Sequence, residues 1–302
     1  MNAHTANTPE ISIVIASWSG ESALRRCLDS LLPQVNDSEV IVALRGPCPP
    51  SFFKEERFRN VRCVSAPDDA SVFQLRSIGV NQSHARSIAL MEDHSTAAPG
   101  WLEAMVAARA AGWLICGGPI ENDPESSGYD SALYFVEYGR FMPPVRTSEV
   151  SVLSGANICY DRDTLWSCRP TWESHFYETD VNAALVNAGE KLHLVSDALV
   201  TSRLRMEFAE AMKHLFTGGV HFGNFRAAGF STVVRWLWLI SSPAVPFVTL
   251  LRIVRITLTR RPARLVQLAR SFFYLIVLLA AWSLGEATGC LQCLKGSDAN
   301  RD

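Results

Sequence analysis

The chain has 302 residues, a formal net charge of −2 and a hydrophobic share of 48%, which is high for a soluble protein. That length allows one large domain or two small ones. The charge is unevenly distributed. From residue 231 onward nine Lys and Arg accompany three Asp and Glu, whereas the earlier residues carry 19 basic and 27 acidic side chains. An acidic front joined to a basic, hydrophobic tail indicates a membrane-attached enzyme, and we expect no nucleic-acid partner.

The eight cysteines are scattered, and several of them lie inside apolar runs. Cys290 and Cys293 form a C-x-x-C pair, but no second pair accompanies it, so we expect no zinc site. We expect free thiols packed as small hydrophobic groups, as in a reducing cytoplasm. Residues 1–10 form a polar tail without the basic and apolar regions of a signal peptide, which predicts a cytoplasmic front domain.

Strand and helix patterns alternate along residues 11–230 and predict an α/β domain with a mostly parallel sheet and right-handed crossovers. Apolar, β-branched runs predict strands at 11–16, 40–44, 61–65, 88–91, 113–120 and 192–200. Apolar residues at helical spacing predict helices at 23–32, 73–83, 101 onward and 131–141, and another that carries Glu178 and Asp180.

The strand at 88–91 ends abruptly in Glu92, Asp93 and His94, three groups that can bind a metal or accept hydrogen bonds. A strand end of this kind lies at the carboxyl edge of the sheet, where open α/β folds bind their ligands. The alternative interpretation is a solvated acidic turn that contributes little to the core.

Several short motifs follow one another at characteristic intervals. They are Ser30-Leu31-Leu32-Pro33-Gln34, Arg76-Ser77-Ile78-Gly79, Glu92-Asp93-His94, Pro99-Gly100-Trp101, Gly155-Ala156-Asn157 and the segment from Tyr177 to Gly189. In this order the chain resembles the inverting glycosyltransferases of family 2 over roughly residues 11–230. The resemblance implies the GT-A nucleotide-sugar fold, Rossmann-like with a mostly parallel sheet.

The same resemblance assigns roles to particular residues. It implies a nucleotide-diphospho-sugar donor bound by Ala16, Ser17, Arg76, Glu92 and Asp93. It implies Mn²⁺ or Mg²⁺ held by Glu92, Asp93 and His94, with His221 as a further candidate ligand, and imidazole favours Mn²⁺ somewhat. It places Gly155, Ala156 and Asn157 on the side of a hydroxyl acceptor, which is a sugar or a lipid-linked sugar. Direct displacement needs a general base, for which Glu178 is the first candidate and Asp180 the second.

Some positions depart from the family pattern. Leu44-Arg45 stands where acids usually read the nucleotide base, and Ser19-Gly20 and Thr201-Ser202 replace other frequent residues. These departures support an alternative function, a catalytically degenerate GT-A domain that serves as a binding or scaffold subunit of a membrane polysaccharide-assembly complex. Glu178 and Asp180 have a structural alternative too, since acids stabilise a helix N-terminus.

Residues 231–290 form the hydrophobic tail, followed by a polar end at 291–302. Val233–Leu251 contains Pro243 and Pro246, and Ser271–Cys290 is long enough to cross a bilayer. Between them, residues 252–270 carry six arginines and no acid, which favours the cytoplasmic face and anionic headgroups. We expect the first stretch to be interfacial or re-entrant and the second to be one true span or an arm of a shallow hairpin. The alternative is a buried helical pair. Membrane lipids are therefore expected partners, in polysaccharide or glycolipid assembly.

Overall fold

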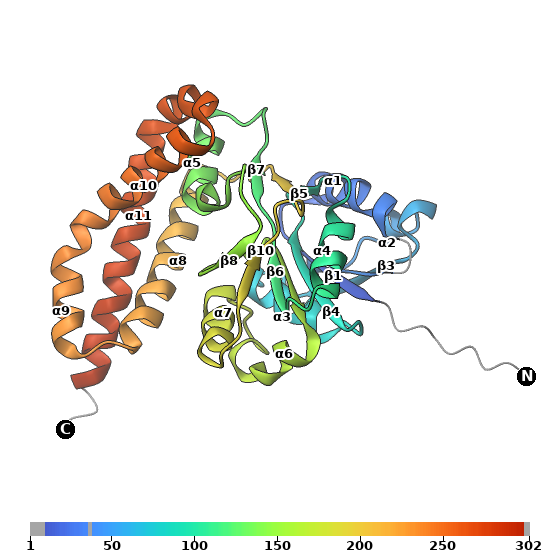
Figure 1. Ribbon diagram of the computed structural model, residues 1–302, viewed down its shortest axis with the longest axis horizontal. Helices are drawn as coiled ribbons and strands as arrows, with labels where there is room; N and C mark the ends of the chain where they lie inside the picture. The colour runs from blue at the N-terminus through green and yellow to red at the C-terminus, as the bar shows by residue number, and fades with distance from the viewer. Residues whose placement is uncertain (1–9, 36–37, 299–302) are drawn as a thin grey trace, which may run out of the picture. The chain divides into compact units, whose positions relative to one another are not determined.

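The computed structural model describes residues 10–35 and 38–298, and describes only the backbone of 50–51 and 295–298. The polar tails predicted for 1–10 and 291–302 therefore lie partly outside the described residues. The chain divides into two compact units (Figure 1). The sheet unit comprises residues up to Glu121 together with Phe141–Ser202, and the helical unit comprises Asn122–Arg140 together with Arg203 onward.

The sheet unit is built on an eight-stranded sheet with the order β3-β2-β1-β4-β9-β6-β10-β8. The strands are β1 (Ile11–Ser17), β2 (Glu39–Arg45), β3 (Val61–Ala66), β4 (Ser87–Glu92), β6 (Ile115–Gly117), β8 (Ser148–Val150), β9 (Asn157–Asp161) and β10 (Leu192–Leu194). Strands β3, β2, β1 and β4 are parallel neighbours, as are β6 and β10, whereas β9 and β8 run antiparallel to theirs. The predicted α/β class with a mostly parallel sheet is confirmed.

A second sheet has three short strands, β5 (Ser95–Ala97), β11 (Val200–Ser202) and β7 (Ile120–Asn122). The single strands predicted at 113–120 and 192–200 are each divided between the two sheets. The physical reason lies at Gly118, where a Cβ atom would overlap the backbone carbonyl of Ala198. The segments that contain Gly118 and Ala198 approach each other closely at the point where each leaves the main sheet and enters the second sheet.

Helices cover the sheet unit, namely α1 (Glu21–Leu31), α2 (Pro50–Phe53), α3 (Val72–Asn81), α4 (Trp101–Ala110), α6 (Arg162–Ser167) and α7 (Glu178–Asn187). In α1 the apolar positions predicted from their spacing are the buried ones, from Ala23 to Leu31. Helix α3 begins at a capping box between Ser71 and Gln74, which satisfies free amides at its first turn.

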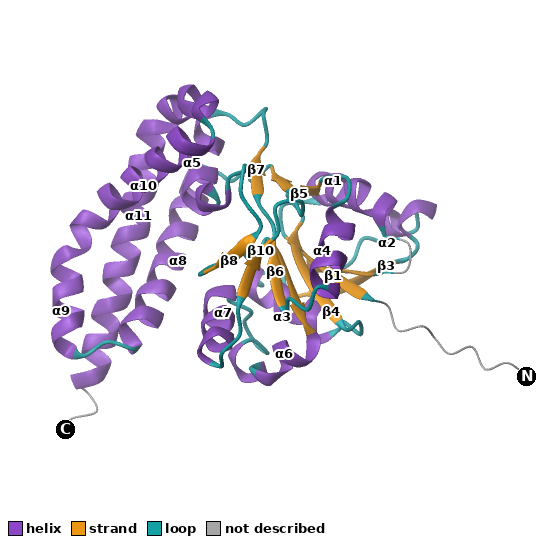
Figure 2. Ribbon diagram, in the orientation of Figure 1, coloured by secondary structure: helices purple, strands orange, loops and turns teal. Residues whose placement is uncertain are grey.

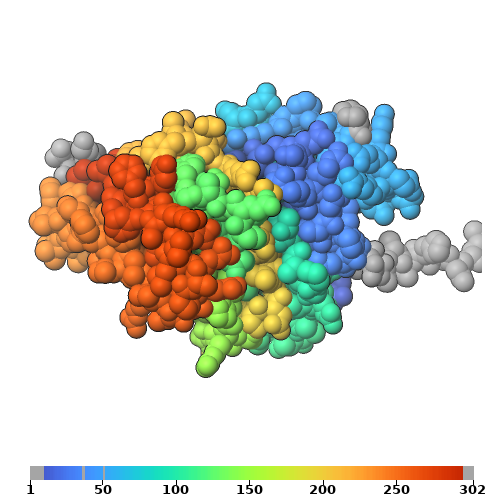
Figure 3. Space-filling view, turned by 90° about the horizontal axis from the view of Figure 1, so that it is seen from above, coloured from blue at the N-terminus to red at the C-terminus, as the bar shows by residue number. Residues whose placement is uncertain are grey.

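The described part of the helical unit consists almost entirely of helices and loops (Figure 2). Its helices are α5 (Gly128–Glu137), α8 (Phe208–Ala228), α9 (Thr232–Ser241), α10 (Val245–Arg260) and α11 (Leu265–Asp298). Helix α11 packs along α8 and also contacts α5, α9 and α10, and Figure 3 shows the surfaces of α5 and of α10–α11 beside each other. By these contacts α5 and α8 belong to the same compact unit as the hydrophobic tail.

Two stretches of the helical unit, Thr232–Arg260 and Pro262–Leu294, are long and apolar enough to cross a membrane by length and composition.

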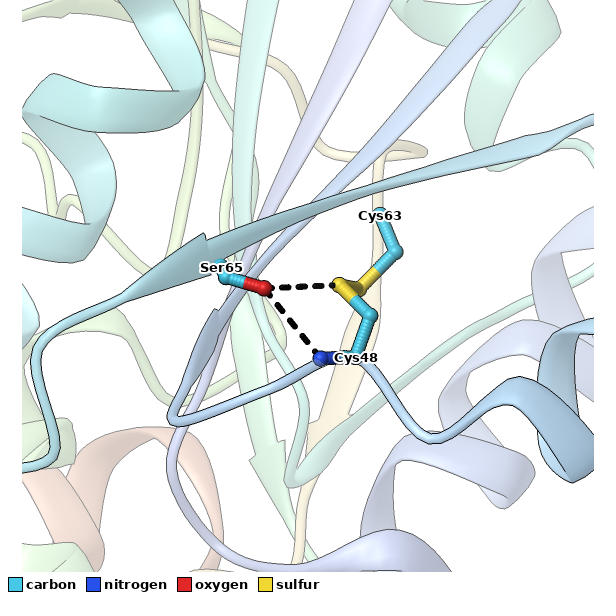
Figure 4. The surroundings of a disulfide bond; sticks show 3 residues. All are labelled: Cys48, Cys63 and Ser65. Carbon is cyan, nitrogen blue, oxygen red and sulfur yellow. Dashed lines mark hydrogen bonds between the residues drawn. A yellow bond between two sulfur atoms is a disulfide. The ribbon is translucent and has the colours of Figure 1, made fainter.

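The expectation that all cysteines are free thiols is wrong for one pair. Cys48, in the loop after β2, forms a disulfide with Cys63 of β3, and the Ser65 hydroxyl accepts a hydrogen bond from the Cys48 amide at 3.2 Å (Figure 4). Sequence spacing alone carries no signal for this pair, because the two residues meet only when β2 and β3 lie side by side. The other six cysteines are free.

Candidate active site

Arg76 lies at the centre of a charged cluster at the edge of the main sheet. Its side chain is only 5% exposed and is held by two carboxylates. One guanidinium nitrogen donates to Glu92 at the end of β4, and the other donates to Glu178 Oε2 at 2.7 Å, at the start of α7. Arg76 thereby joins two residues to which the sequence assigned different roles, donor binding and catalysis.

Two glycines set the position of Arg76. Gly79, one turn later in α3, faces Val14 of β1 so closely that a Cβ atom would overlap it, which brings the helix close to the sheet. Gly155 lies against the guanidinium itself, because a Cβ atom there would be 2.6 Å from Arg76 Nη1. The Gly155-Ala156-Asn157 motif thus approaches the cluster through backbone, as only glycine permits.

Asp93 organises the turn that follows β1. Its Oδ2 accepts hydrogen bonds from the Ser17 hydroxyl at 2.9 Å and from the Trp18 and Ser19 amides at 2.8 Å each. The amide of Asp93 in turn donates to the carbonyl of Ala16 at 3.2 Å. Burial raises the pKa of the Asp93 carboxyl above its ordinary value, opposed by the His94 imidazole and by the hydrogen bonds from the turn.

The three residues at the end of β4 are buried, with exposures of 5% for Glu92, 0% for Asp93 and 3% for His94. The alternative of a solvated acidic turn is therefore wrong. The reason is the contacts that these residues make with the turn after β1 and with Arg76 of α3. Substitutions here are expected to affect stability as well as binding.

A divalent metal is implied by the family resemblance, and the buried groups offer a partial set of ligands for it. Asp93 Oδ1 accepts no hydrogen bond from any described residue, and it lies 3.8 Å from His94 Nδ1. Glu92 Oε2 is 3.3 Å from His94 Nε2. Across residues 10–35 and 38–298, no group of three or more His, Cys, Asp or Glu could hold a metal ion. Asp93 and its neighbours alone therefore make an incomplete set of ligands, and a divalent ion bound here would need further ligands from donor phosphates and water.

Asn157 is buried, and its side chain holds the centre of the sheet unit together. Its Oδ1 accepts a hydrogen bond from the Trp101 indole at 2.9 Å, and its amide nitrogen donates to the carbonyls of Pro119 at 3.1 Å and Ala198 at 2.8 Å. The Trp of the Pro99-Gly100-Trp101 motif and the Asn of the Gly155-Ala156-Asn157 motif are therefore partners. The hydrogen bonds thus give a structural reason for Trp at position 101 and for Asn at position 157.

Glu178 and Asp180 occupy the first turn of α7. The side chain of Glu178 is 20% exposed, so it is partly accessible to solvent beside its contact with Arg76. Their helix position agrees with the dipole interpretation as well, because carboxylates stabilise a helix N-terminus. The contact with Arg76 distinguishes Glu178 from an acid that only caps a helix.

Trp18 is a residue that the sequence reasoning missed. Its ring lies 5.7 Å from the His94 ring and 5.9 Å from the guanidinium carbon of Arg45. Arg45 Nε donates to the carbonyl of Ala70 at 2.6 Å, so the arginine is held at the end of β2. The available signal was a large aromatic residue in a turn where small residues predominate.

His221, the further candidate metal ligand, lies exposed on α8 of the helical unit.

Residues 12–169 match the model of the family "Glycosyl transferase family 2", which is just over half of the chain. The chain therefore belongs to this glycosyltransferase family, and its fold is GT-A. No curated protein matches the sequence.

The solved structures to which the chain is similar include the following three. Staphylococcus aureus TarS 1–349 matches with a TM-score of 0.50 at 11% identity over 91% of this chain and 92% of its own. The same protein in complex with UDP-GlcNAc matches with a TM-score of 0.50 at 12% identity over 92% of each chain. GalNAc-T7 with UDP, GalNAc and Mn²⁺ matches with a TM-score of 0.49 at 14% identity. That match covers 67% of this chain and less than half, 45%, of GalNAc-T7.

Proposed function

We propose that the chain transfers a sugar from a nucleotide-diphospho-sugar to a hydroxyl acceptor with inversion at the anomeric carbon. The acceptor oxygen forms a bond to the anomeric carbon while the bond from that carbon to the diphosphate oxygen breaks. The acceptor proton passes to a carboxylate. The observation that carries the proposal is the buried Arg76, which pairs with Glu92 at the strand end and with Glu178 at the start of α7.

Glu178 is the proposed general base, because its carboxylate is partly exposed and oriented by a fixed guanidinium. Asp180, two residues further along α7, is the alternative base. Gly155 and Ala156 are proposed on the acceptor side, where glycine keeps the backbone close to Arg76. Asn157 contributes there by holding the backbone in place through its buried hydrogen bonds.

On the donor side, Ala16 and Ser17 belong to the β1 end that Asp93 orders, and Arg76 supplies positive charge for the diphosphate. Glu92, Asp93 and His94 are the proposed holders of Mn²⁺ or Mg²⁺. When bound, such an ion neutralises charge on the leaving diphosphate. The protein's own contribution is a buried, preorganised turn that excludes water from this side of the site.

We further propose that transfer occurs at the cytoplasmic face of a membrane, in polysaccharide or glycolipid assembly. The support is the chain's basic, hydrophobic tail and its two long apolar stretches. The acceptor is then a sugar or lipid-linked sugar at that face.

A thermal-shift panel of UDP-, GDP- and dTDP-sugars with and without Mn²⁺ tests donor binding, beginning with UDP-GlcNAc because TarS holds it. We expect metal-dependent stabilisation by one nucleotide, and its loss in Asp93→Asn. The donor found is then used to measure transfer by Glu178→Gln and Asp180→Asn, with the exposed Glu103→Gln on α4 as the matched control.

Glu178→Gln should bind donor but lose turnover, because an amide cannot accept the proton. Activity in Glu178→Gln with none in Asp180→Asn would move the base to Asp180. Silence across the whole panel would instead support the alternative, a degenerate domain acting as a binding or scaffold subunit.

A further inference from the structure

Helices α8 and α11 are joined by an unusually close backbone contact. Gly219 and Gly223 of α8 face Gly285 and Gly289 of α11, and a Cβ atom at any of the four would overlap backbone of the other helix. Small residues four apart on both helices allow such an approach. The two helices therefore pack as one element, and separating α11 from α8 would lose this contact.

Helix α8 carries a polar stripe along its length. The stripe consists of Glu210, Lys213, Thr217, His221 and Asn224, of which the first four are exposed and the last is half-buried. Asn224 extends it onto α11 through a hydrogen bond to Gln292 at 2.9 Å. Hydrocarbon around this stripe would desolvate several charged and polar groups at once, which is strongly unfavourable.

A charged pair holds the interior of the helical unit. Glu286 of α11 is 2% exposed and accepts hydrogen bonds from Arg226 of α8 at 3.0 Å and from the Trp238 indole of α9 at 3.2 Å. The Arg226 guanidinium also stacks on the Trp238 ring at 3.8 Å. These contacts connect α8, α9 and α11 and give the buried carboxylate two hydrogen-bond donors.

Exposed apolar side chains also occur on α8 and α11, but on α9 and α10 they predominate. Only 6% of the most apolar window of Thr232–Arg260 is buried. Seven exposed side chains repeat at helical spacing through both helices and form what we call the apolar face: Val233, Trp236, Leu237, Ile240, Phe247, Val248 and Leu251. Their exposures reach 74% at Ile240 and 68% at Leu251. An apolar surface of this extent marks an interaction site.

Positive charge follows this face directly along the chain. Arg252 and Arg255 are exposed on α10, and no acid occurs between residues 252 and 270, where six arginines lie. An apolar helix face next to clustered arginines matches an anionic bilayer surface, where acyl chains take the apolar groups and headgroups take the charges.

We propose that the apolar face of α9 and α10 lies in the plane of an anionic lipid surface and that α11 does not cross the bilayer. This inference deepens the proposed membrane location and does not depend on catalysis. Of the two arrangements expected for Ser271–Cys290, it disfavours the true span, because the close contact with α8 and its polar stripe makes burial of that segment in hydrocarbon unfavourable. It retains the interfacial role expected for Val233–Leu251.

Vesicle flotation of the full-length protein tests the lipid partner. Wild type should float with phosphatidylglycerol vesicles, and less with phosphatidylcholine or at high salt. Ile240→Glu with Val248→Glu should lower flotation at least tenfold, whereas Thr217→Glu on the polar stripe is the matched control and should float normally. Equal flotation of all three would overturn the proposal. So would a lipid-independent dimer that the paired Glu substitutions disperse, since the occupant would then be a second copy.

Topology is tested by Ala263→Cys, in the turn just before α11, and Gln292→Cys, near the other end of α11, in a background without the half-buried Cys168 and Cys293. The helical stretch from Leu265 to Gln292 spans about 40 Å, so a crossing helix would place the two cysteines on opposite sides of the bilayer. Protein is added to preformed vesicles and treated with an impermeant maleimide. We expect both sites to label from outside, and protection of either until detergent is added would refute the in-plane arrangement. Donor binding, measured separately, reports on the proposed transferase function.

Discussion

Arg76 is predicted to stabilise the sheet unit substantially through its ion pairs with Glu92 and Glu178. Arg76→Met keeps much of the side-chain length but leaves two carboxylates without their shared cation. The side chain of Glu92 is 6% exposed and that of Glu178 is 20% exposed. Removing one partner of a buried ion pair costs about 3–5 kcal/mol, and the partial exposure of Glu178 favours about 3 kcal/mol. At about 2–4 °C per kcal/mol for a unit of this size, the melting temperature should fall by about 6–12 °C.

The measurement is thermal unfolding followed by near-ultraviolet circular dichroism in mild detergent. Arg76→Met combined with Glu92→Gln should recover a substantial part of the loss, because the second change removes one uncompensated charge. Arg57→Met is the control, since Arg57 pairs with Asp29 and Glu55 on the surface, where such pairs contribute about 0–1 kcal/mol. A fall of less than about 2 °C in Arg76→Met, or no recovery in the double variant, would refute the reasoning.

Two further predictions concern the frame of the site. Trp101→Phe removes the indole donor from the buried Oδ1 of Asn157 and should lower the free energy of unfolding by about 1–3 kcal/mol in urea titration; a change no larger than in Trp113→Phe would count against this role. Cys48→Ser removes a disulfide that joins residues 15 apart and should lower the free energy of unfolding by about 3 kcal/mol. Reduced wild type should be as stable as the variant, and reductant should not change the stability of the variant. Unequal losses in the variant and the reduced protein would contradict that explanation.

The central strands were predictable because their residues are buried on both faces. The run at Ile11–Ala16 is continuous and β-branched, and the strand observed there is buried at every residue. The divided strands were not predictable, because the division depends on the contact of Gly118 with Ala198, which are far apart in sequence. The edge strand β8 has only three residues and no apolar run, so local pattern carries no signal for it.

For the candidate site, residue positions were predictable and residue partners were not. Counting from the strand end placed Arg76 near the acid cluster, and its ion pair with Glu92 agrees with that expectation. The contact of Arg76 with Glu178 joins residues 102 apart in sequence, so spacing could not indicate it. The structural roles of Asn157 and Trp101 could not be predicted either. The sequence does not show whether an Asn side chain makes its hydrogen bonds inside the protein or contacts a substrate.

The sheet order explains why these distant motifs meet. Strand β4 lies between β1 and β9, and it pairs Glu92 with Ala16 on one side and Met91 with Asn157 on the other. Since β1 is parallel to β4, the turn after β1 lies at the same sheet edge as Glu92. Since β9 is antiparallel, its first residue, and Gly155 just before it, reach that edge too. A shift of β4 by one residue would turn Glu92 to the opposite face and separate it from Arg76. The register that completes the sheet is thus also the register that assembles the charged cluster.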